Sequence, residues 1–265
     1  MFQYGKKTYI MGILNVTPDS FSDGGDFYDI ERALEHAREI ISQGGDIIDI
    51  GGESTRPGHN VISSQEEIDR LTPVIERIKR ELGVYVSVDT YKPDVAEAAL
   101  KLGADMINDI WGLQRYEEMA GVVAKYGADI CIMHNQDGTE YEGDIMDEMK
   151  KFFEKSIEIA TKAGIDKKQI VLDPGIGFGK DLEQNIEVLS RLEELQELGY
   201  PVLLGTSRKR FIGTILETTE PKDRMEGTVA TTVLGIDKGV DIVRVHDVLE
   251  NARAAKMADA IYRRI

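Results

Sequence analysis

Polar side chains recur along the chain directly after short apolar runs, where the strands of a parallel sheet would end. Asp89, Asn108 and Asp173 each stand at such a position. Carboxylate and amide groups can hold a flat heterocycle through its adjacent N–H donors and acceptors. A buried carboxylate that accepts two parallel N–H bonds makes a strong and directional contact. These three residues are therefore candidates for binding a nitrogen heterocycle.

A second group of residues at such positions is cationic. The turn Ser207-Arg208-Lys209 follows the seventh apolar run, and Arg244 and His246 lie at the end of the eighth. In barrels of alternating strands and helices, the loops after strands seven and eight commonly bind phosphate. The pattern predicts an anion site. Asn15 ends the first run, and the long segments after the first two runs contain Gly, Ser and Pro, as loops that close over a reaction do.

Several familiar motifs do not fit the sequence. The run Gly175 to Lys180 superficially resembles nucleotide-binding loops. However, the third glycine of a Rossmann fingerprint would fall at Lys180, and a P-loop requires Ser or Thr where Asp181 stands. His36 is expected on the solvent side of a helix and His59 in a loop, and no HxxxH or CxxC spacing exists, so no zinc site is predicted.

Other polar residues near strand ends have two readings. His134 could contact a ligand or be a hydrogen-bonded residue at the end of a strand, and the second reading is favoured. Asp109 and Asp247 fit a helix cap as well as a site residue. Cys131 falls in the middle of an apolar run and is expected to be an inert, buried side chain.

The elements that must position these residues recur as a unit. A helix-like segment ends in Gly, a small or apolar residue and Asp, and a short apolar run follows, as in 44–48 and 239–243. Gly suits the left-handed cap of a helix, and such a run suits a buried parallel strand. Strands are expected at about 9–15, 47–51, 84–89, 106–109, 129–133, 170–173, 202–205 and 242–245.

Segments with helical periodicity separate these strands. Helices are expected at about 30–41, 68–82, 93–102, 116–125, 144–163, 182–198, 224–238 and 248–264. Ser64 and Glu67 stand at capping-box spacing before the second of them.

Alternating strands and helices fit either a closed (β/α)8 TIM barrel or an open doubly wound sheet. Eight units, a length of 265 residues and the lack of a Rossmann fingerprint favour the barrel. We therefore predict an α/β fold, a single TIM-barrel domain over residues 1–265 with its active site at the C-terminal ends of the strands.

The charge balance limits the classes of partner. The chain has 48 Asp plus Glu against 32 Lys plus Arg, a formal net charge of −16. Such acidity disfavours nucleic acids and anionic membrane surfaces, and the apolar runs are shorter than the roughly 20 residues that span a bilayer. The single cysteine excludes an internal disulfide and suits a reducing compartment. We expect a cytoplasmic protein that acts on small molecules.

Two stretches carry highly specific motifs. Residues 11–25 and 51–58 resemble the first and second signatures of the dihydropteroate synthases. The shorter segments 87–92, 107–110, 172–180, 206–209 and 242–247 match the rest of that pattern in order. The resemblance extends from about residue 9 to the C-terminus. It departs at 133–138, where many members have Met-His-Met, a basic residue or Gln, and then Gly, so the role of this loop stays open.

The resemblance implies a reaction in folate biosynthesis. The family condenses (7,8-dihydropterin-6-yl)methyl diphosphate with 4-aminobenzoate to give 7,8-dihydropteroate and diphosphate. Its mechanism is largely dissociative, with diphosphate leaving before the arylamine attacks. Two alternatives are a methyltransferase of the methyltetrahydrofolate–corrinoid type and a catalytically silent pterin-binding barrel. The first would not be expected to keep residues 53–58 together with 207–209, and the second could lose Asn15 or the loops.

The resemblance also implies roles for individual residues. The pterin would be held by Asp89, Asn108, Asp173 and Lys209, and the diphosphate by Asn15, Arg244 and His246. The aminobenzoate slot would be formed by Phe21, Thr55, Arg56, Pro57, Phe178, Ser207 and Lys209. Catalytic roles are implied for Asp89, Asp173, Lys209, Arg244 and His246. Asn15 would be a ligand of Mg²⁺, the one cofactor implied. A homodimer through outer helices near the C-terminus and competition by sulfonamides are further expectations.

Overall fold

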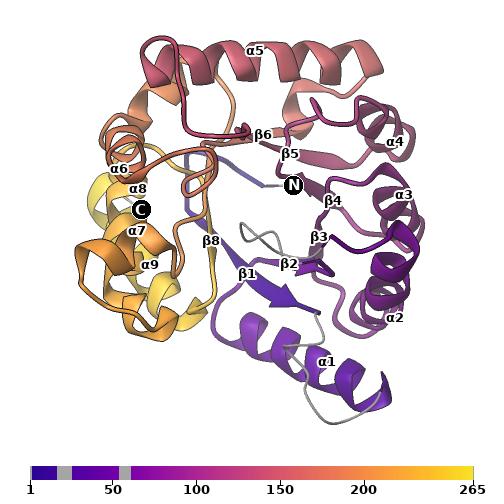
Figure 1. Ribbon diagram of the computed structural model, residues 1–265. Helices are drawn as coiled ribbons and strands as arrows, with labels where there is room; N and C mark the ends of the chain where they lie inside the picture. The colour runs from indigo at the N-terminus through magenta and orange to yellow at the C-terminus, as the bar shows by residue number, and fades with distance from the viewer. Residues whose placement is uncertain (1, 17–25, 54–60, 265) are drawn as a thin grey trace.

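The computed structural model describes residues 2–16, 26–53 and 61–264, in which eight parallel strands alternate with helices around a barrel (Figure 1). The strands are β1 (Tyr9–Asn15), β2 (Ile47–Gly51), β3 (Tyr85–Asp89), β4 (Met106–Asp109), β5 (Asp129–Met133), β6 (Ile170–Asp173), β7 (Leu203–Leu204) and β8 (Ile242–Val245). Their bounds agree with the expected runs to within one residue at each end. The predicted TIM barrel is confirmed.

The strands pair in the order β6-β5-β4-β3-β2-β1-β8-β7. A single parallel bridge, between Leu172 and Val202, joins β6 to the segment that leads into β7 and closes the ring. Because all strands are parallel, their C-terminal ends meet at one mouth of the barrel.

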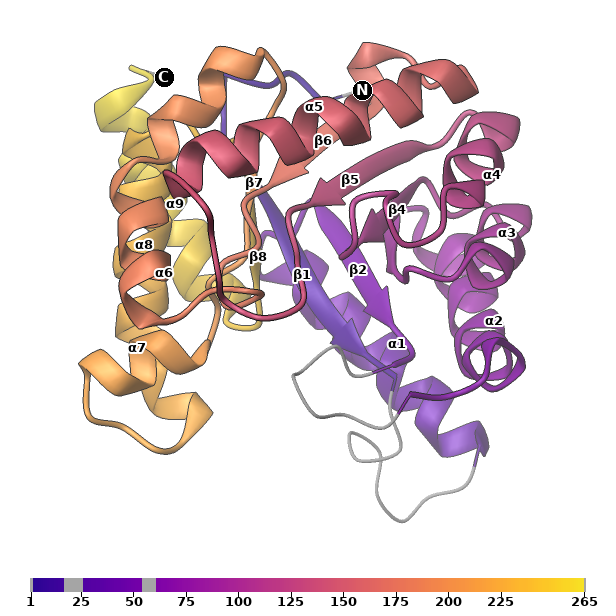
Figure 2. The same ribbon diagram turned by 45° about the horizontal axis from the view of Figure 1, so that its top comes forward.

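Helices cover the outside of the barrel (Figure 2). They are α1 (Asp26–Ser42), α2 (Ser64–Leu82), α3 (Pro93–Lys101), α4 (Glu118–Tyr126), α5 (Ile145–Ala163), α6 (Leu182–Ser190), α7 (Arg210–Ile215), α8 (Met225–Asp237) and α9 (Val248–Tyr262), with the 3₁₀ helices η2 (Lys167–Gln169), η3 (Leu192–Leu198) and η4 (Pro221–Arg224). None of the helices within the described ranges is both long and apolar enough to cross a membrane.

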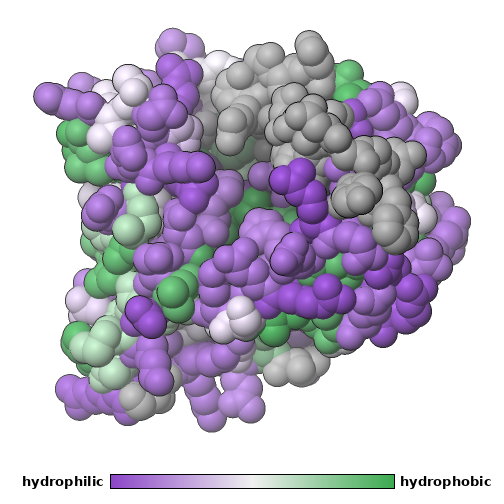
Figure 3. Space-filling model, turned by 90° about the horizontal axis from the view of Figure 1, so that it is seen from below, coloured by the Kyte–Doolittle hydropathy of each residue, from purple (hydrophilic) through white to green (hydrophobic). Residues whose placement is uncertain are grey.

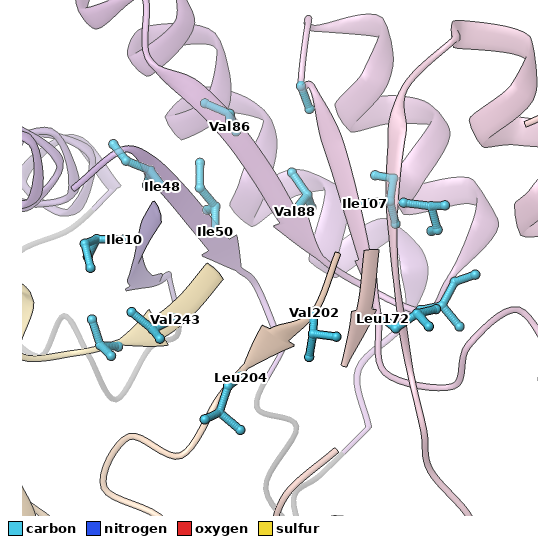
Figure 4. Packing of buried hydrophobic residues seen from close by; sticks show 14 of the residues in the cluster. Ile10, Ile48, Ile50, Val86, Val88, Ile107, Leu172, Val202, Leu204 and Val243 are labelled. Carbon is cyan, nitrogen blue, oxygen red and sulfur yellow. The ribbon is translucent and has the colours of Figure 1, made fainter. Parts of the chain in front are cut away.

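Alternate residues of each strand contribute to two separate cores, as expected for a closed barrel. Figure 4 shows the core between strands and helices, where Ile48, Ile50, Val86 and Val88 gather. The barrel interior holds Tyr9, Met11, Ile47, Met106, Cys131, Val171, Leu203 and Ile242, with Phe2, Tyr4 and Tyr85 packed against them. Cys131 is fully buried there, and burial raises its pKa, in agreement with an inert side chain.

Two local expectations were wrong. The helix expected at 182–198 divides at Arg191 into α6 and η3. Leu192 and Leu195 are both buried, and a spacing of three residues places them on one face of a 3₁₀ helix. The N-cap of α2 is Ser63 instead of Ser64, and its hydroxyl accepts a bond from the Glu66 amide at 3.2 Å. Glu67 is buried and pairs with a lysine instead of closing a capping box.

Candidate active site

Arg244 connects the two sides of the barrel mouth. Arg244 lies on β8, and its Nε donates to Oδ2 of Asp49 on β2 at 2.5 Å. Its Nη2 donates to Oδ2 of Asp89, the last residue of β3, at 2.7 Å. The amide of Asn108 on β4 donates to the same Asp49 oxygen at 3.3 Å. One guanidinium therefore orients two carboxylates, and one of these also fixes the amide.

The remaining oxygens of this group are acceptors without donors. Oδ1 of Asp49, Oδ1 of Asp89 and Oδ1 of Asn108 are buried and have no hydrogen-bond partner among the described residues, and neither has the Ser87 hydroxyl. A buried acceptor without a donor costs about 1–3 kcal/mol. Because these atoms lie on three neighbouring strands, a bound molecule with several N–H groups would satisfy them together.

The mouth combines buried carboxylates with half-buried cations. Burial raises the pKa of Asp89 to about 7, although Arg244 opposes the shift. Burial also raises the pKa of Asp173, against the effect of Lys209 and the Gly175 amide. In the opposite direction, burial lowers the pKa of Lys209 to about 8, although Asp173 favours its charged form. Perturbed groups of this kind gather at functional sites more often than elsewhere.

Asp173 and Lys209 meet beside Gly205. A Cβ atom at Gly205 would lie 3.9 Å from Oδ2 of Asp173, 4.0 Å from Nζ of Lys209 and 3.8 Å from Cβ of Arg244. Lys209 Nζ donates to the carbonyl of Ile176 and lies 4.7 Å from the centre of the Phe178 ring. The lack of a side chain at Gly205 therefore leaves room where an anionic and a cationic group converge.

Ser207 and His246 form one further contact at the mouth. The Ser207 hydroxyl lies 3.0 Å from Nδ1 of His246 and accepts a bond from the His246 amide at 3.1 Å. Arg208 pairs with Asp247 through its Nε, which lies 3.0 Å from Oδ2 of that carboxylate. Asp247 stands at the N-cap position of α9 but makes no side-chain cap bond. Asp109 does not cap a helix, because the N-cap of α4 is Glu117; its carboxylate accepts the amides of Trp111 and Leu113 in the turn after β4.

The structure brings most of the predicted residues to this mouth. They are Asn15, Asp89, Asn108, Asp173, Phe178, Ser207, Lys209, Arg244 and His246. Asn15 is exposed at the end of β1, and a Cβ at Gly51 would lie 3.6 Å from its Oδ1 and 3.8 Å from Cβ of Asp89. Phe21, Thr55, Arg56 and Pro57 lie outside the described residues.

His134 is a hydrogen-bonded residue at the end of a strand, the reading favoured from the sequence. It is 2% exposed, and its Nδ1 lies 2.9 Å from Nζ of Lys180. Its ring packs edge-on against Phe152. His134 therefore contacts Lys180 and Phe152 within the protein interior.

Sequence reasoning missed three buried charged residues around the mouth. Asp49 interrupts the apolar run of β2, and that interruption was the available signal. Lys180 stands in the matching segment 172–180 and in the rejected nucleotide-binding pattern, and neither assigns it a role. Lys92 binds Glu53 at 2.6 Å, Glu67 at 2.8 Å and the Ile62 carbonyl at 2.7 Å, which connects the two chain segments on either side of residues 54–60. No local pattern marks Lys92, because its partners are distant in sequence.

The described residues contain no group of three or more His, Cys, Asp or Glu side chains that could enclose a metal ion. Asn15 offers an exposed amide oxygen at the mouth, which is a suitable donor for Mg²⁺ that keeps its waters and binds mainly to substrate oxygens. This single amide oxygen fits an Mg²⁺ ion that is held mainly by oxygens of the substrate.

Comparisons with known proteins decide the family. Residues 11–246 match the family model described as pterin binding enzyme. The dihydropteroate synthase of Clostridium beijerinckii is 56% identical over 264 residues, which cover 99% of this chain and 97% of that protein. The chain belongs to the dihydropteroate synthase family. It is accordingly a transferase, as the motifs predicted.

Solved structures of dihydropteroate synthases agree with the fold. One from Clostridium difficile, in the presence of pteroic acid, is 65% identical with a TM-score of 0.97, covering 99% of this chain and 100% of that chain. One from Xanthomonas albilineans, with 4-aminobenzoic acid, is 41% identical with a TM-score of 0.92, covering 97% of this chain and 94% of that one. These similarities extend over the whole barrel, including all strands that carry the mouth residues.

Proposed function

We propose that this chain condenses (7,8-dihydropterin-6-yl)methyl diphosphate with 4-aminobenzoate to give 7,8-dihydropteroate and diphosphate. The observation that carries the proposal is the set of buried acceptors on Asp49, Asp89 and Asn108, which have no donors among the described residues. A dihydropterin edge presents an amino group and ring N–H groups. The pteroic acid and 4-aminobenzoic acid named with the relatives support the same substrates.

Recognition of the pterin follows from these acceptors. Asp89 and Asn108 would accept its N–H groups from one side of the mouth, with Asp49 beside them. Asp173 would accept from the other side, and Lys209, which lies near it, would donate to a ring acceptor. Arg244 keeps Asp89 oriented and partly neutralised before substrate binds. Such preorganisation limits the reorganisation needed at the moment of reaction.

Departure of diphosphate would begin the reaction. The bond between the methylene carbon and the diphosphate oxygen breaks, and the electron pair leaves with the diphosphate. Arg244, His246 and Asn15 would bind this leaving group, with His246 held by Ser207. When bound, Mg²⁺ would neutralise charge on the diphosphate oxygens. The cation left on the pterin is delocalised, and the carboxylates of Asp89 and Asp173 stabilise it electrostatically.

The amine of 4-aminobenzoate would then form the new carbon–nitrogen bond and lose one proton. An arylamine is nucleophilic in its neutral form, so the step requires no strong base. Phe178, Ser207 and Lys209 would line its slot together with Phe21, Thr55, Arg56 and Pro57. Sulfonamides have the same shape as the aminobenzoate and would compete for this slot.

We propose that two copies of the chain form a homodimer in the cytoplasm. Apolar side chains lie exposed on α8 and α9, including Leu234, Met257 and Ile261. In Figure 3 apolar residues gather along the left margin, on the side where α7 to α9 lie in Figure 1. The single, buried and unpaired Cys131 supports a reducing compartment.

The purified chain with both substrates and Mg²⁺ tests the proposal directly. Release of diphosphate is expected only when 4-aminobenzoate is present, with formation of dihydropteroate. Binding of the pterin without any product would instead indicate a silent pterin-binding barrel. A requirement for a corrinoid partner would indicate the methyltransferase alternative.

A further inference from the structure

The loop between β6 and α6 lies between two amines, one half-buried and one buried. From one side, Nζ of Lys209 donates to the Ile176 carbonyl and contacts the Phe178 ring. From the other, Nζ of Lys180 donates to the carbonyls of Gly175 at 3.1 Å and Phe178 at 3.0 Å. The residues that contact Lys209 therefore belong to a segment that Lys180 also holds.

Lys180 is placed as an interior residue. It is 7% exposed, and burial lowers its pKa to about 7. Two carbonyl oxygens and Nδ1 of His134 surround its Nζ, which matches the three N–H bonds of an ammonium group. Within the part of the chain that is described, no carboxylate pairs with it. Since a buried amine is costly, its backbone partners indicate that it stabilises a particular loop conformation.

His134 supplies the fixed end of this connection. Burial lowers the pKa of His134 to about 2, so the ring is neutral and can accept a bond at Nδ1. The loop rests directly on the same part of the chain. A Cβ at Gly175 would lie 1.9 Å from the His134 carbonyl oxygen, and one at Gly179 would lie 2.9 Å from the Gln136 carbonyl oxygen. The segment after β5 therefore forms the support on which the β6–α6 loop lies.

We propose that Lys180 is a positioning residue for the 4-aminobenzoate subsite, acting through the β6–α6 loop on Phe178 and Lys209. The inference rests on the proposed function and assigns a role to the divergent segment after β5. Asn185 fixes the same loop from α6, because its Oδ1 accepts the Gly177 amide at 2.6 Å. Three of the pterin acceptors, Asp49, Asp89 and Asn108, lie on β2 to β4, away from this loop, whereas Asp173 accepts the Gly175 amide of the loop at 2.7 Å. Lys209 belongs to both subsites, but Phe178 is assigned to the aminobenzoate slot alone. Loss of Lys180 should therefore affect 4-aminobenzoate more than the pterin.

The kinetic test is the variant Lys180→Met. We expect its KM for 4-aminobenzoate to rise about tenfold or more, because small displacements of contact groups can cost up to about 10²-fold. Its KM for the pterin diphosphate should change less than about threefold. Lys150→Met is the matched control, since Lys150 is bound by Glu194 and Glu197 on the outer surface. Equal changes in both KM values, or no change in either, would overturn the proposal.

A second variant tests the hydrogen bond itself. His134→Phe removes the Nδ1 acceptor but keeps an aromatic ring against Phe152. It should raise KM for 4-aminobenzoate in the same direction by a smaller factor. If both residues act through one contact, the double variant should resemble Lys180→Met alone, whereas independent sites would give multiplied effects. A multiplied effect would contradict the proposed connection. His134→Phe carries the kinetic test if Lys180→Met does not fold.

Amide hydrogen exchange separates this inference from the proposed function. In Lys180→Met, exchange over residues 174–181 should become about tenfold faster, since local opening is easier when a buried contact is lost. The Lys150→Met control should exchange like the parent chain there. Unchanged exchange in both Lys180→Met and His134→Phe would overturn the positioning role. Failure of the parent chain to release diphosphate would overturn the proposed function without altering this readout.

Discussion

Asp89 has two conflicting requirements at the mouth. Its ionised form accepts N–H groups at both oxygens, yet burial favours its neutral form and raises its pKa to about 7. We predict that Asp89→Asn lowers kcat/KM by about 10²–10³, the usual loss for one preorganised polar group. The chain should stay folded, because Arg244 keeps Asp49 as its second partner when the Asp89 charge is removed. Activity assays and urea titrations measure both, with exposed Asp94→Asn as the control. Full activity in Asp89→Asn would contradict its assignment.

Lys209 makes activity and stability depend on pH in opposite directions. Its pKa is lowered from 10.5 to about 8, with burial as the main cause. Between these values the unfolded chain keeps a proton that the folded chain has lost, so the free energy of unfolding rises with pH. Activity should fall through the same range, because the donor ammonium is lost. Below about pH 8 both states are protonated, and this residue contributes no slope.

The prediction for Lys209 is tested by a difference in unfolding free energy between two proteins. Unfolding free energies of the parent chain and Lys209→Met are compared from pH 7 to 10, so that the titration of groups distant from Lys209 cancels. A difference that does not change with pH would show that the lysine is not held in a pKa-lowering environment.

The glycines of the β6–α6 loop allow close contact between elements. Gly175 has a φ of +66°, and a Cβ there would overlap the His134 carbonyl oxygen at 1.9 Å. Gly164, at the C-terminal end of α5, has a φ of +96°. A Cβ atom added there would have no non-neighbouring atom within 4 Å. We predict that Gly164→Ala costs about 1–2 kcal/mol of unfolding free energy, the cost of left-handed backbone alone. Gly175→Ala should cost clearly more, because backbone atoms must also move. Equal losses in urea unfolding would refute the packing argument.

Features that depend on neighbouring residues could be predicted from the sequence, whereas contacts between distant residues could not. Buried parallel strands read as short apolar runs, four of them directly after a Gly-X-Asp helix end, so β1 to β8 could be placed from the sequence alone. The position of the barrel mouth could then be predicted, because parallel strands bring their C-terminal ends together. Asp49 could not be found in this way, since its partner Arg244 is 195 positions away. Lys180 escaped for a similar reason, because its importance depends on His134, which lies on another strand end.

For the whole molecule, the exposed apolar residues of α9 give a prediction about assembly. Met257 and Ile261 are 63% and 61% exposed and lie one turn apart on the helix. Ile261→Glu should convert the proposed dimer to a monomer, since a charge in an apolar interface must be desolvated. Sedimentation measures the mass, and Val61→Glu, at a residue 69% exposed, is the control. A dimer that survives the α9 substitution would place the interface elsewhere.

The bridge between Leu172 and Val202 is the single pairing that joins β6 to the chain before β7, whereas the other neighbouring strands share at least two residue pairs. Asp173 and Lys209 lie on opposite sides of this join, so a pterin that contacts both would connect them non-covalently. Occupancy of the mouth should then protect the Leu172 amide, which donates to Pro201 at 2.9 Å, from hydrogen exchange. The substrate would thus contribute to the cohesion of the barrel, and its release would restore local opening at the join.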